Sequence, residues 1–378
     1  MLIDRTIFGR VREKLAGEPR VIVLYGPRQS GKTFLLTKLV ENEKRRVLFL
    51  RGESLPVQEI FSQPIFETIN SFVGNAEVLV IDEAQKIDNI GQSLKLLFDT
   101  RPLPILVSGS ASFDLANKLA EPMTGRATFF TLYPLSLTEA PAPFPNPGIK
   151  TRLDDYLRFG MYPRVHTLTA QAEKEEYLLE VIDTYLHNDL LTFREIRKPK
   201  KILDLLALLA HQIGSEACLD ELARNLFLDW QTVEKYLDVL EKMFVIINLR
   251  GLSRNLRKEI SKTSKYYFYD VGVRNAIIRN FNPLSLRNDV GGLFENFCIL
   301  ERMKFLANQR KFANFYFWRT YDQKEIDLIE ERDGKLRAFE FKYGPVKISK
   351  ATQREFLETY PGSEFEVVTP ENLLTFVS

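Results

Sequence analysis

The stretch VIVLYGPRQSGKTFLL (21–36) decides the fold of the N-terminal part of the chain. Its first five residues are a continuous apolar, largely β-branched run, which predicts a strand buried on both faces. Residues 26–33 fit the pattern G-x-x-x-x-G-K-[ST], and the residues after them predict a helix over 34–41. A strand, a glycine-rich loop and a helix in this order are the context in which the pattern binds phosphate groups.

Each type of residue in the pattern has a physical role in binding phosphates. Its glycines let the backbone wrap around phosphates with its N–H groups pointing inward. Lys32 would reach the β- and γ-phosphates, and the Thr33 hydroxyl would ligate Mg²⁺. We therefore predict ATP as ligand and Mg²⁺ as cofactor. The predicted nucleotide-binding residues here are Gly26, Pro27, Arg28, Gln29, Ser30, Gly31, Lys32 and Thr33.

Two carboxylates end a second apolar run, AEVLVID (76–82). Asp82 would hold Mg²⁺, usually through water, and Glu83 stands where a general base can polarise the attacking water. Two ordinary acids at a strand end are the alternative, but the loop at 26–33 favours the catalytic interpretation. Lys32 and Glu83 are therefore predicted catalytic residues, with Thr33 and Asp82 as metal ligands.

Three further residues are weaker candidates for the same site. Ser108 and Ser110 follow the apolar run LPILVSG (103–109), at the strand edge where parallel sheets bind ligands, although ordinary turn chemistry explains them too. Arg126 could stabilise the transferring phosphoryl group, within the chain or across a subunit boundary, or be a surface arginine.

Strand-like and helix-like segments alternate from residue 21 to about 132, which predicts a parallel α/β sheet because parallel strands need crossover connections. Further strands are predicted at 45–50 and 127–132, and a helix around 57–73. The proline-rich stretch 138–150 predicts a domain boundary.

The middle of the chain predicts a winged helix. Two short helices within 219–243 are followed by a strand at 244–249 and a basic stretch at 250–270. Acidic residues on the second helix would meet nucleic-acid phosphates unfavourably, so packing against the ATPase part is the alternative role. The cations expected to contact DNA or RNA phosphates are Arg250, Arg254, Arg257, Lys258, Lys262 and Lys265.

A third pattern begins after about residue 285, with alternating strands and helices again. Glu295 lies on a predicted helix, Asp327 on a strand, and Glu340 and Lys342 on the next strand. Residues i and i+2 of a strand face the same side, so Glu340 and Lys342 point together. Asp327 and Glu340 could share a divalent metal while Lys342 orients water. The order resembles the PD-(D/E)XK nuclease fold, with an inert scaffold as the alternative.

Composition sets limits on the rest. The 378 residues carry a net charge of only +2, so global charge does not indicate nucleic acid. The two cysteines form neither a disulfide framework nor a zinc pattern. No apolar signal core and no run of about 20 apolar residues is visible, so we expect a cytoplasmic protein without a membrane partner.

Several motifs together resemble a bacterial and archaeal family of AAA-type ATPases whose C-terminal region has no assigned function. The resemblance implies an ATPase fold, a winged-helix middle and a nuclease-like end, and we predict these domains at 1–140, 150–285 and 286–378. A helicase is less favoured, because no second motor domain is visible. The motifs are GPRQSGKT (26–33), VLVIDEAQK (78–86), LVSGSASFDL (106–115), TGRATFFTLYPLSLTE (124–139), YLRFGMYPRV (156–165), TYLHNDL (184–190), YDVGVRNAI (269–277) and GGLFENF (291–297).

Two classes of function remain open from the sequence. One is ATP hydrolysis coupled to movement of the C-terminal domains, acting on or near nucleic acid. The other is a nucleotide-dependent switch that binds a protein partner or associates with itself, with the nuclease-like part as an inactive scaffold.

Overall fold

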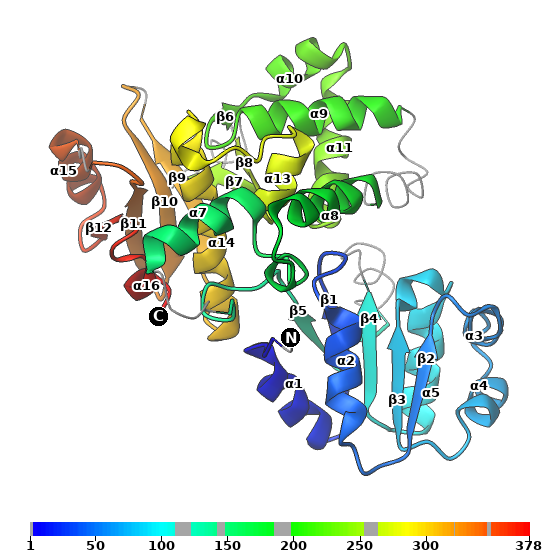
Figure 1. The fold of residues 1–378 in the computed structure, drawn as a ribbon. Helices are drawn as coiled ribbons and strands as arrows, with labels where there is room; N and C mark the ends of the chain where they lie inside the picture. The colour runs from blue at the N-terminus through cyan, green and yellow to red at the C-terminus, as the bar shows by residue number, and fades with distance from the viewer. Residues whose placement is uncertain are drawn as a thin grey trace. The chain divides into compact units, whose positions relative to one another are not determined.

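The computed structural model describes residues 3–109, 122–141, 148–184, 198–252, 264–320, 322–345 and 349–378 of the chain. These residues form two compact units. The first comprises Met1–Pro134 with Lys242–Phe244, and the second comprises Leu135–Glu241 with Val245–Ser378. The elements of both are labelled in Figure 1.

The first unit contains a five-stranded sheet in the order β2-β3-β4-β1-β5. All its neighbouring strands pair in parallel, which confirms the expected parallel α/β fold and the strand expected at 127–132. Parallel strands place all their carboxyl ends at one edge, and the glycine-rich loop leaves β1 there. The strands are β1 (Val21–Tyr25), β2 (Val47–Arg51), β3 (Val78–Asp82), β4 (Ile105–Gly109) and β5 (Ala127–Thr131).

Helices cover both faces of this sheet (Figure 1). Alternate residues of β1 explain why: Val21 and Val23 join the core with α3, α4 and α5, whereas Ile22 and Leu24 join the core with α1 and α2. The helix expected around 57–73 is two helices, because Pro64 cannot continue an α-helix. The helices are α1 (Ile7–Ala16), α2 (Lys32–Glu41), α3 (Leu55–Phe61), α4 (Phe66–Val73) and α5 (Ile90–Thr100).

The second unit contains a mixed seven-stranded sheet in the order β12-β11-β10-β9-β7-β8-β6. β7 pairs with β9 in parallel, with Arg250 opposite Tyr316 and Gly251 opposite Phe317. One sheet therefore joins residues on either side of position 285. The strands are β6 (Glu216–Ala217), β7 (Ile246–Gly251), β8 (Ser264–Phe268), β9 (Asn314–Arg319), β10 (Glu325–Arg332), β11 (Lys335–Phe341) and β12 (Glu364–Val368).

The helices of the second unit include the long α14, which carries Glu295. The second unit contains both of the C-terminal segments that the sequence divides into separate domains. The three-domain division itself stays a prediction. No helix in the described ranges is long and apolar enough to cross a membrane. The helices are α7 (Ile149–Phe159), α8 (Gln171–Thr184), α9 (Pro199–His211), α10 (Leu219–Leu226), α11 (Trp230–Lys242), α13 (Val271–Ile277), α14 (Val290–Asn308), α15 (Lys350–Thr359) and α16 (Leu373–Phe376).

Candidate functional site

Two glycines shape the loop between β1 and α2. Gly26 has φ +152°, and a Cβ added there would lie 2.3 Å from the carbonyl oxygen of Leu132, just after β5. Gly31 precedes α2 with φ +97°, in the left-handed region that favours glycine. The close approach at Gly26 and the left-handed turn at Gly31 therefore require the two glycines of the pattern.

Lys32 is 4% exposed and is held by its own loop. Its Nζ donates to the carbonyl oxygens of Gly26 at 2.9 Å and Pro27 at 2.7 Å. Its ammonium therefore lies inside the curve of the loop, beside the N-terminus of α2. A helix N-terminus carries partial positive charge, so the loop, the helix and Lys32 together favour a phosphate group.

Arg5, from the segment before α1, braces the same loop from outside. Its Nη1 donates to the carbonyl oxygen of Ser30 at 2.8 Å, and its Nη2 donates to the carbonyl oxygen of Tyr133 at 2.5 Å. Arg5 thereby joins the loop to the segment that leaves β5. The sequence analysis missed it, because it precedes the loop pattern by more than twenty residues.

Asp82 is the centre of the hydrogen bonds at the carboxyl edge of the sheet. Its Oδ2 accepts from Thr33 Oγ1 at 2.7 Å, and its Oδ1 accepts from Ser108 Oγ. The three side chains come from α2, β3 and β4, so the fold brings together residues that lie far apart in the sequence. An oxygen cluster beside a phosphate-binding loop suits Mg²⁺. The structure therefore brings Thr33, Asp82 and Ser108 together.

Glu83 follows directly and has φ +55°, an uncommon conformation for a non-glycine residue. Its N–H donates to Ser108 Oγ at 3.2 Å, and its Oε2 accepts from Gln85 Nε2 at 2.5 Å. Gly52 lies against this turn, and its N–H donates to the carbonyl oxygen of Asp82 at 2.7 Å. Backbone strain of this kind is common at active sites.

Arg126 lies elsewhere, which corrects its predicted role within the chain. It precedes Ala127, which pairs with Val21 at the start of β1, so it stands at the amino edge of the sheet. The loop at 26–33 leaves the opposite edge. Arg126 Nε also pairs with Asp99 Oδ1 at 2.5 Å. Within one chain it therefore cannot reach the phosphate site. Ser110 lies outside the described residues.

The four nuclease-like candidates gather in the second unit. Lys342 Nζ donates to Glu340 Oε1 at 2.6 Å, and the Phe341 N–H donates to Asp327 Oδ2 at 2.8 Å. Burial, together with the nearby Glu295 and Glu340 carboxylates, raises the pKa of Asp327 well above its usual value. Burial also raises the pKa of Glu295.

Three residues that the sequence analysis did not assign to this cluster complete it. Lys265 Nζ pairs with Glu295 Oε1 at 3.3 Å and with Glu325, and the Tyr267 hydroxyl donates to Glu295 Oε1. Burial opposes the charge of Lys265, but the Glu295 and Glu325 carboxylates raise its pKa above the usual value. Among the described residues, no group of three or more His, Cys, Asp and Glu side chains is arranged to hold a metal ion.

The basic stretch is also corrected at one position. Lys265 was expected to contact nucleic-acid phosphates, yet it is 0% exposed and belongs to the carboxylate cluster. Residues 265–268 of β8 are all buried, and Lys265 and Tyr267, two apart on the strand, both contact Glu295. Arg250 is exposed near the end of β7. Arg254, Arg257, Lys258 and Lys262 lie outside the described residues.

Comparisons with known families match three segments of the chain. Residues 18–140 match the family model described as an AAA domain. Residues 150–284 and 290–374 match two families described as domains of unknown function. The first match and the geometry around Lys32 and Asp82 agree. The N-terminal unit thus contains an AAA-type P-loop domain. Domains of this class bind nucleotides, and many of them hydrolyse ATP.

The chain is similar over most of its length to uncharacterized proteins of other organisms. An uncharacterized protein of Mycobacterium tuberculosis is 29% identical over 350 residues, covering 90% of this chain and 74% of the relative. An uncharacterized protein of Methanocaldococcus jannaschii is 26% identical over 388 residues, covering 93% of this chain and 85% of the relative.

Two solved structures show a distant likeness to the chain. A Walker-type ATPase of Pyrococcus abyssi has a TM-score of 0.49 and 16% identity, covering 73% of this chain and 96% of that chain. The RuvB Holliday junction branch migration motor of Thermotoga maritima has a TM-score of 0.34 and 15% identity, covering 65% of this chain and 89% of that chain. At these TM-scores neither structure adds to the assignment.

Proposed function

We propose that the chain binds ATP together with Mg²⁺ at residues 26–33 and hydrolyses it. The observation that carries this proposal is the hydrogen bond of 2.7 Å from Thr33 Oγ1 to Asp82 Oδ2, beside the buried ammonium of Lys32. A P-loop threonine and a strand-end aspartate are the residues that hold Mg²⁺ in P-loop ATPases.

The oxygen donors fit that ion. Thr33 and Asp82 would hold Mg²⁺, which prefers few protein oxygens and keeps several waters. When bound, Mg²⁺ supplies positive charge that neutralises the phosphate oxygens. Ser108, which donates to Asp82 Oδ1, holds the carboxylate in place.

The other residues of the site bind the phosphates and accept the proton of the attacking water. The loop N–H groups and Lys32 bind the phosphates, and Glu83 orients a water and accepts its proton as the oxygen attacks the γ-phosphorus. The bond between the γ-phosphorus and the β,γ-bridging oxygen breaks, which leaves ADP and phosphate. Arg126 would stabilise the transferring phosphoryl group of a neighbouring subunit, across a subunit boundary.

The test is Mg²⁺-dependent phosphate release by wild-type protein and by Glu83→Gln. We expect kcat to fall by about 10²–10⁴-fold in the variant, the usual contribution of a general base. Binding of a fluorescent ATP analogue should change by less than about threefold, since Glu83 acts on water. Equal turnover by both proteins would overturn the role of Glu83, and absence of analogue binding by wild type would overturn the site.

We further propose that hydrolysis moves elements of the second unit that act on or near nucleic acid. The support is the order of elements from α9 to β8, in which α10, α11 and an antiparallel three-stranded pairing resemble a winged helix. Stimulation of ATP turnover by duplex or single-stranded DNA is the expected result. Turnover indifferent to both would favour the alternative, a nucleotide-dependent switch for a protein partner.

A metal-dependent nuclease activity is the second candidate for the cluster of Glu295, Asp327, Glu340 and Lys342. Its support is geometric: Asp327 and Glu340 lie on the neighbouring strands β10 and β11, the Phe341 N–H donates to Asp327 Oδ2, and Lys342 Nζ donates to Glu340 Oε1. Cleavage of DNA or RNA with Mn²⁺ or Mg²⁺, lost in Asp327→Asn, would support it. No cleavage of either substrate with ATP and both metals supplied would instead support a scaffold.

A further inference from the structure

Two aromatic side chains are exposed at the turn between α10 and α11. Phe227 is 87% exposed and Trp230 is 50% exposed. Phe227 also has φ +54°, a left-handed conformation that a bulky residue rarely adopts. Phe227 is the C-terminal cap of α10, where the left-handed conformation usually belongs to glycine or asparagine. A large exposed ring at that position buries little apolar surface within the chain. We call residues 227–230 the aromatic turn.

The two helices that flank the aromatic turn carry more acidic than basic side chains. Lys201 Nζ lies 5.9 Å from the Phe227 ring centroid but pairs with Asp204 at 3.5 Å. Acidic side chains repel phosphates, so nucleic acid would be contacted by other parts of the second unit, and this turn suits a basic protein surface. An apolar pocket with a basic rim is the complementary surface. Residues 219–242 carry six carboxylates, Asp220, Glu221, Asp229, Glu234, Asp238 and Glu241, against three cations, Arg224, Lys235 and Lys242.

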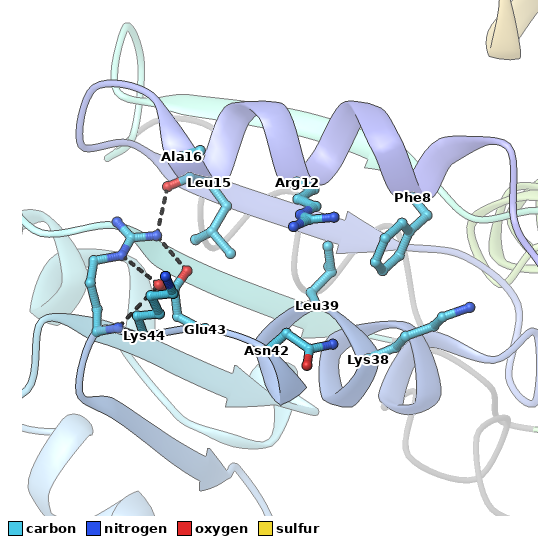
Figure 2. A pocket seen from close by; sticks show the side chains of 10 residues that line it. Phe8, Arg12, Leu15, Ala16, Lys38, Leu39, Asn42, Glu43 and Lys44 are labelled. Atoms are coloured by element: carbon cyan, nitrogen blue, oxygen red, sulfur yellow. Dashed lines mark hydrogen bonds and ion pairs between the residues drawn. The ribbon is translucent and has the colours of Figure 1, made fainter.

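The first unit carries a pocket of this kind between α1 and α2 (Figure 2). Its volume of about 460 Å³ lies in the range of about 300–1,000 Å³ that holds ligand groups. Phe8, Leu15 and Leu39 supply its apolar surface. The remaining lining residues are Arg12, Ala16, Lys38, Asn42, Glu43, Lys44 and Arg45.

Two of the pocket's cations remain uncompensated. Arg45 pairs with Glu43 at 2.7 Å, and Lys38 pairs with Asp4 at 2.6 Å. Arg12 and Lys44 form no ion pair among the residues that the structure describes. Figure 2 shows Arg12 between Phe8 and Leu15, over Leu39. The pocket therefore joins an apolar interior to excess positive charge.

We propose that this pocket binds the aromatic turn of a second copy of this chain. The apolar pocket would take the exposed rings, and Arg12 and Lys44 would face the carboxylates around them. The two surfaces are different parts of the chain, so the contact is heterologous. Repeated head to tail, such a contact closes into a ring or continues as a filament. The inference does not depend on ATP hydrolysis.

Sedimentation velocity over a concentration series tests the aromatic turn. Wild-type chains should associate, and Phe227→Ser with Trp230→Ser should raise the dissociation constant by about tenfold or more, as loss of central aromatic anchors does. Phe312→Ser is the matched control, because Phe312 is 94% exposed but lies on neither surface. Circular dichroism melting should show that all the variants fold.

A charge exchange tests the pairing of the two surfaces. Arg12→Glu with Lys44→Glu makes both surfaces acidic, and Glu221→Lys with Glu234→Lys makes both basic, so neither double variant should associate alone. An equimolar mixture should associate again, since each variant then offers the complement of the other. A monomeric wild type at every concentration, association unchanged by both exchanges, or a mixture that stays monomeric would each overturn the proposal.

Discussion

Gly52 lies where one methyl group would collide with the strand end that carries Asp82 and Glu83. A Cβ there would be 2.3 Å from the Glu83 carbonyl oxygen and 3.1 Å from that of Asp82. Gly52→Ala should therefore displace this turn, lower kcat for ATP hydrolysis, and lower the free energy of unfolding by about 1–3 kcal/mol, as overpacking does.

Gly9→Ala is the control for that substitution. Gly9 lies within α1, and a Cβ there would meet no atom within 4 Å. Alanine should raise the free energy of unfolding by about 0.5–1 kcal/mol because it favours the helix, and turnover should stay unchanged. Urea unfolding and phosphate release on both variants give the comparison. Equal behaviour of the two would remove the steric role of Gly52.

His166 gives the second unit a calculable dependence on pH. Burial, helped by nearby Lys174, Lys304 and Arg152 against an opposing Asp155, lowers its pKa from 6.5 to about 4. Above pH 6.5 the imidazole is neutral in both folded and unfolded chains. Between pH 6.5 and 4 only the unfolded chain takes up the proton, so stability falls as pH falls, by up to about 3 kcal/mol.

His166→Phe should remove that dependence while keeping a ring beside Tyr156, whose centroid lies 5.5 Å from that of His166. The difference in free energy of unfolding between wild type and variant should shrink or reverse by up to about 3 kcal/mol from pH 7 to pH 4. Urea titrations at both pH values measure it. Parallel curves for the two proteins would contradict the assigned pKa.

Single residues were predictable where a local pattern fixes them. Lys32, Thr33 and Asp82 follow from a loop pattern and a strand end, and the fold gathers the last two. Arg126 and Lys265 were not predictable in this way. The surroundings of Arg126 depend on the edge of the sheet at which it lies, and those of Lys265 depend on the face of the strand to which its side chain points. Neither property can be read from the residues alone.

At the scale of elements, α14 anchors the segment that follows Pro134. Lys304 Nζ donates to the Leu135 carbonyl oxygen at 2.9 Å and to Glu301 Oε1 at 2.7 Å. Glu301 Oε2 accepts from the Leu137 N–H at 2.6 Å. Glu301 is 1% and Lys304 3% exposed, so the two charges depend on each other.

Lys304→Met should therefore lower the free energy of unfolding by about 3–5 kcal/mol, because it leaves the Glu301 carboxylate buried without its counter-charge. It should also speed hydrogen exchange at the Leu137 amide. Glu301→Gln combined with Lys304→Met removes both charges and should recover much of the loss. A single variant no less stable than the double one would show that the pair is not coupled.

Elements with strong periodicity were predictable in kind and place. The strands expected at 45–50 and 127–132 lie at Val47–Arg51 and Ala127–Thr131, within two residues of the expected bounds. The break between α3 and α4 was not foreseen, since the apolar spacing continues across Pro64 while its ring prevents the helix from doing so.

At the scale of the molecule, the seven-stranded sheet joins segments that the sequence assigned to different domains. The Asn296 side chain, on α14, accepts from the Phe268 N–H at 2.7 Å and donates to the Phe268 carbonyl oxygen at 2.8 Å, which adds a link to β8. Sequence patterns describe each strand but not which distant strand it pairs with, so the pairing of β7 with β9 could not be predicted.

This continuity predicts how the second unit melts. Calorimetry should resolve one transition for the first unit and one for the second, because a continuous sheet unfolds cooperatively. A chain that stops after residue 285 should lose the second transition, since β7 would then have an unpaired edge. A third transition in the full chain, or a second one in the shortened chain, would contradict the prediction.

All five strands of the first sheet lie within residues 21–131, before any strand of the second. During synthesis the ribosome therefore delivers the whole nucleotide-binding sheet first. At about 5–20 residues per second, the chain after residue 134 takes roughly 12–50 seconds more to emerge. The nascent sheet can thus fold, and meet cellular ATP, while the second unit has still to be translated.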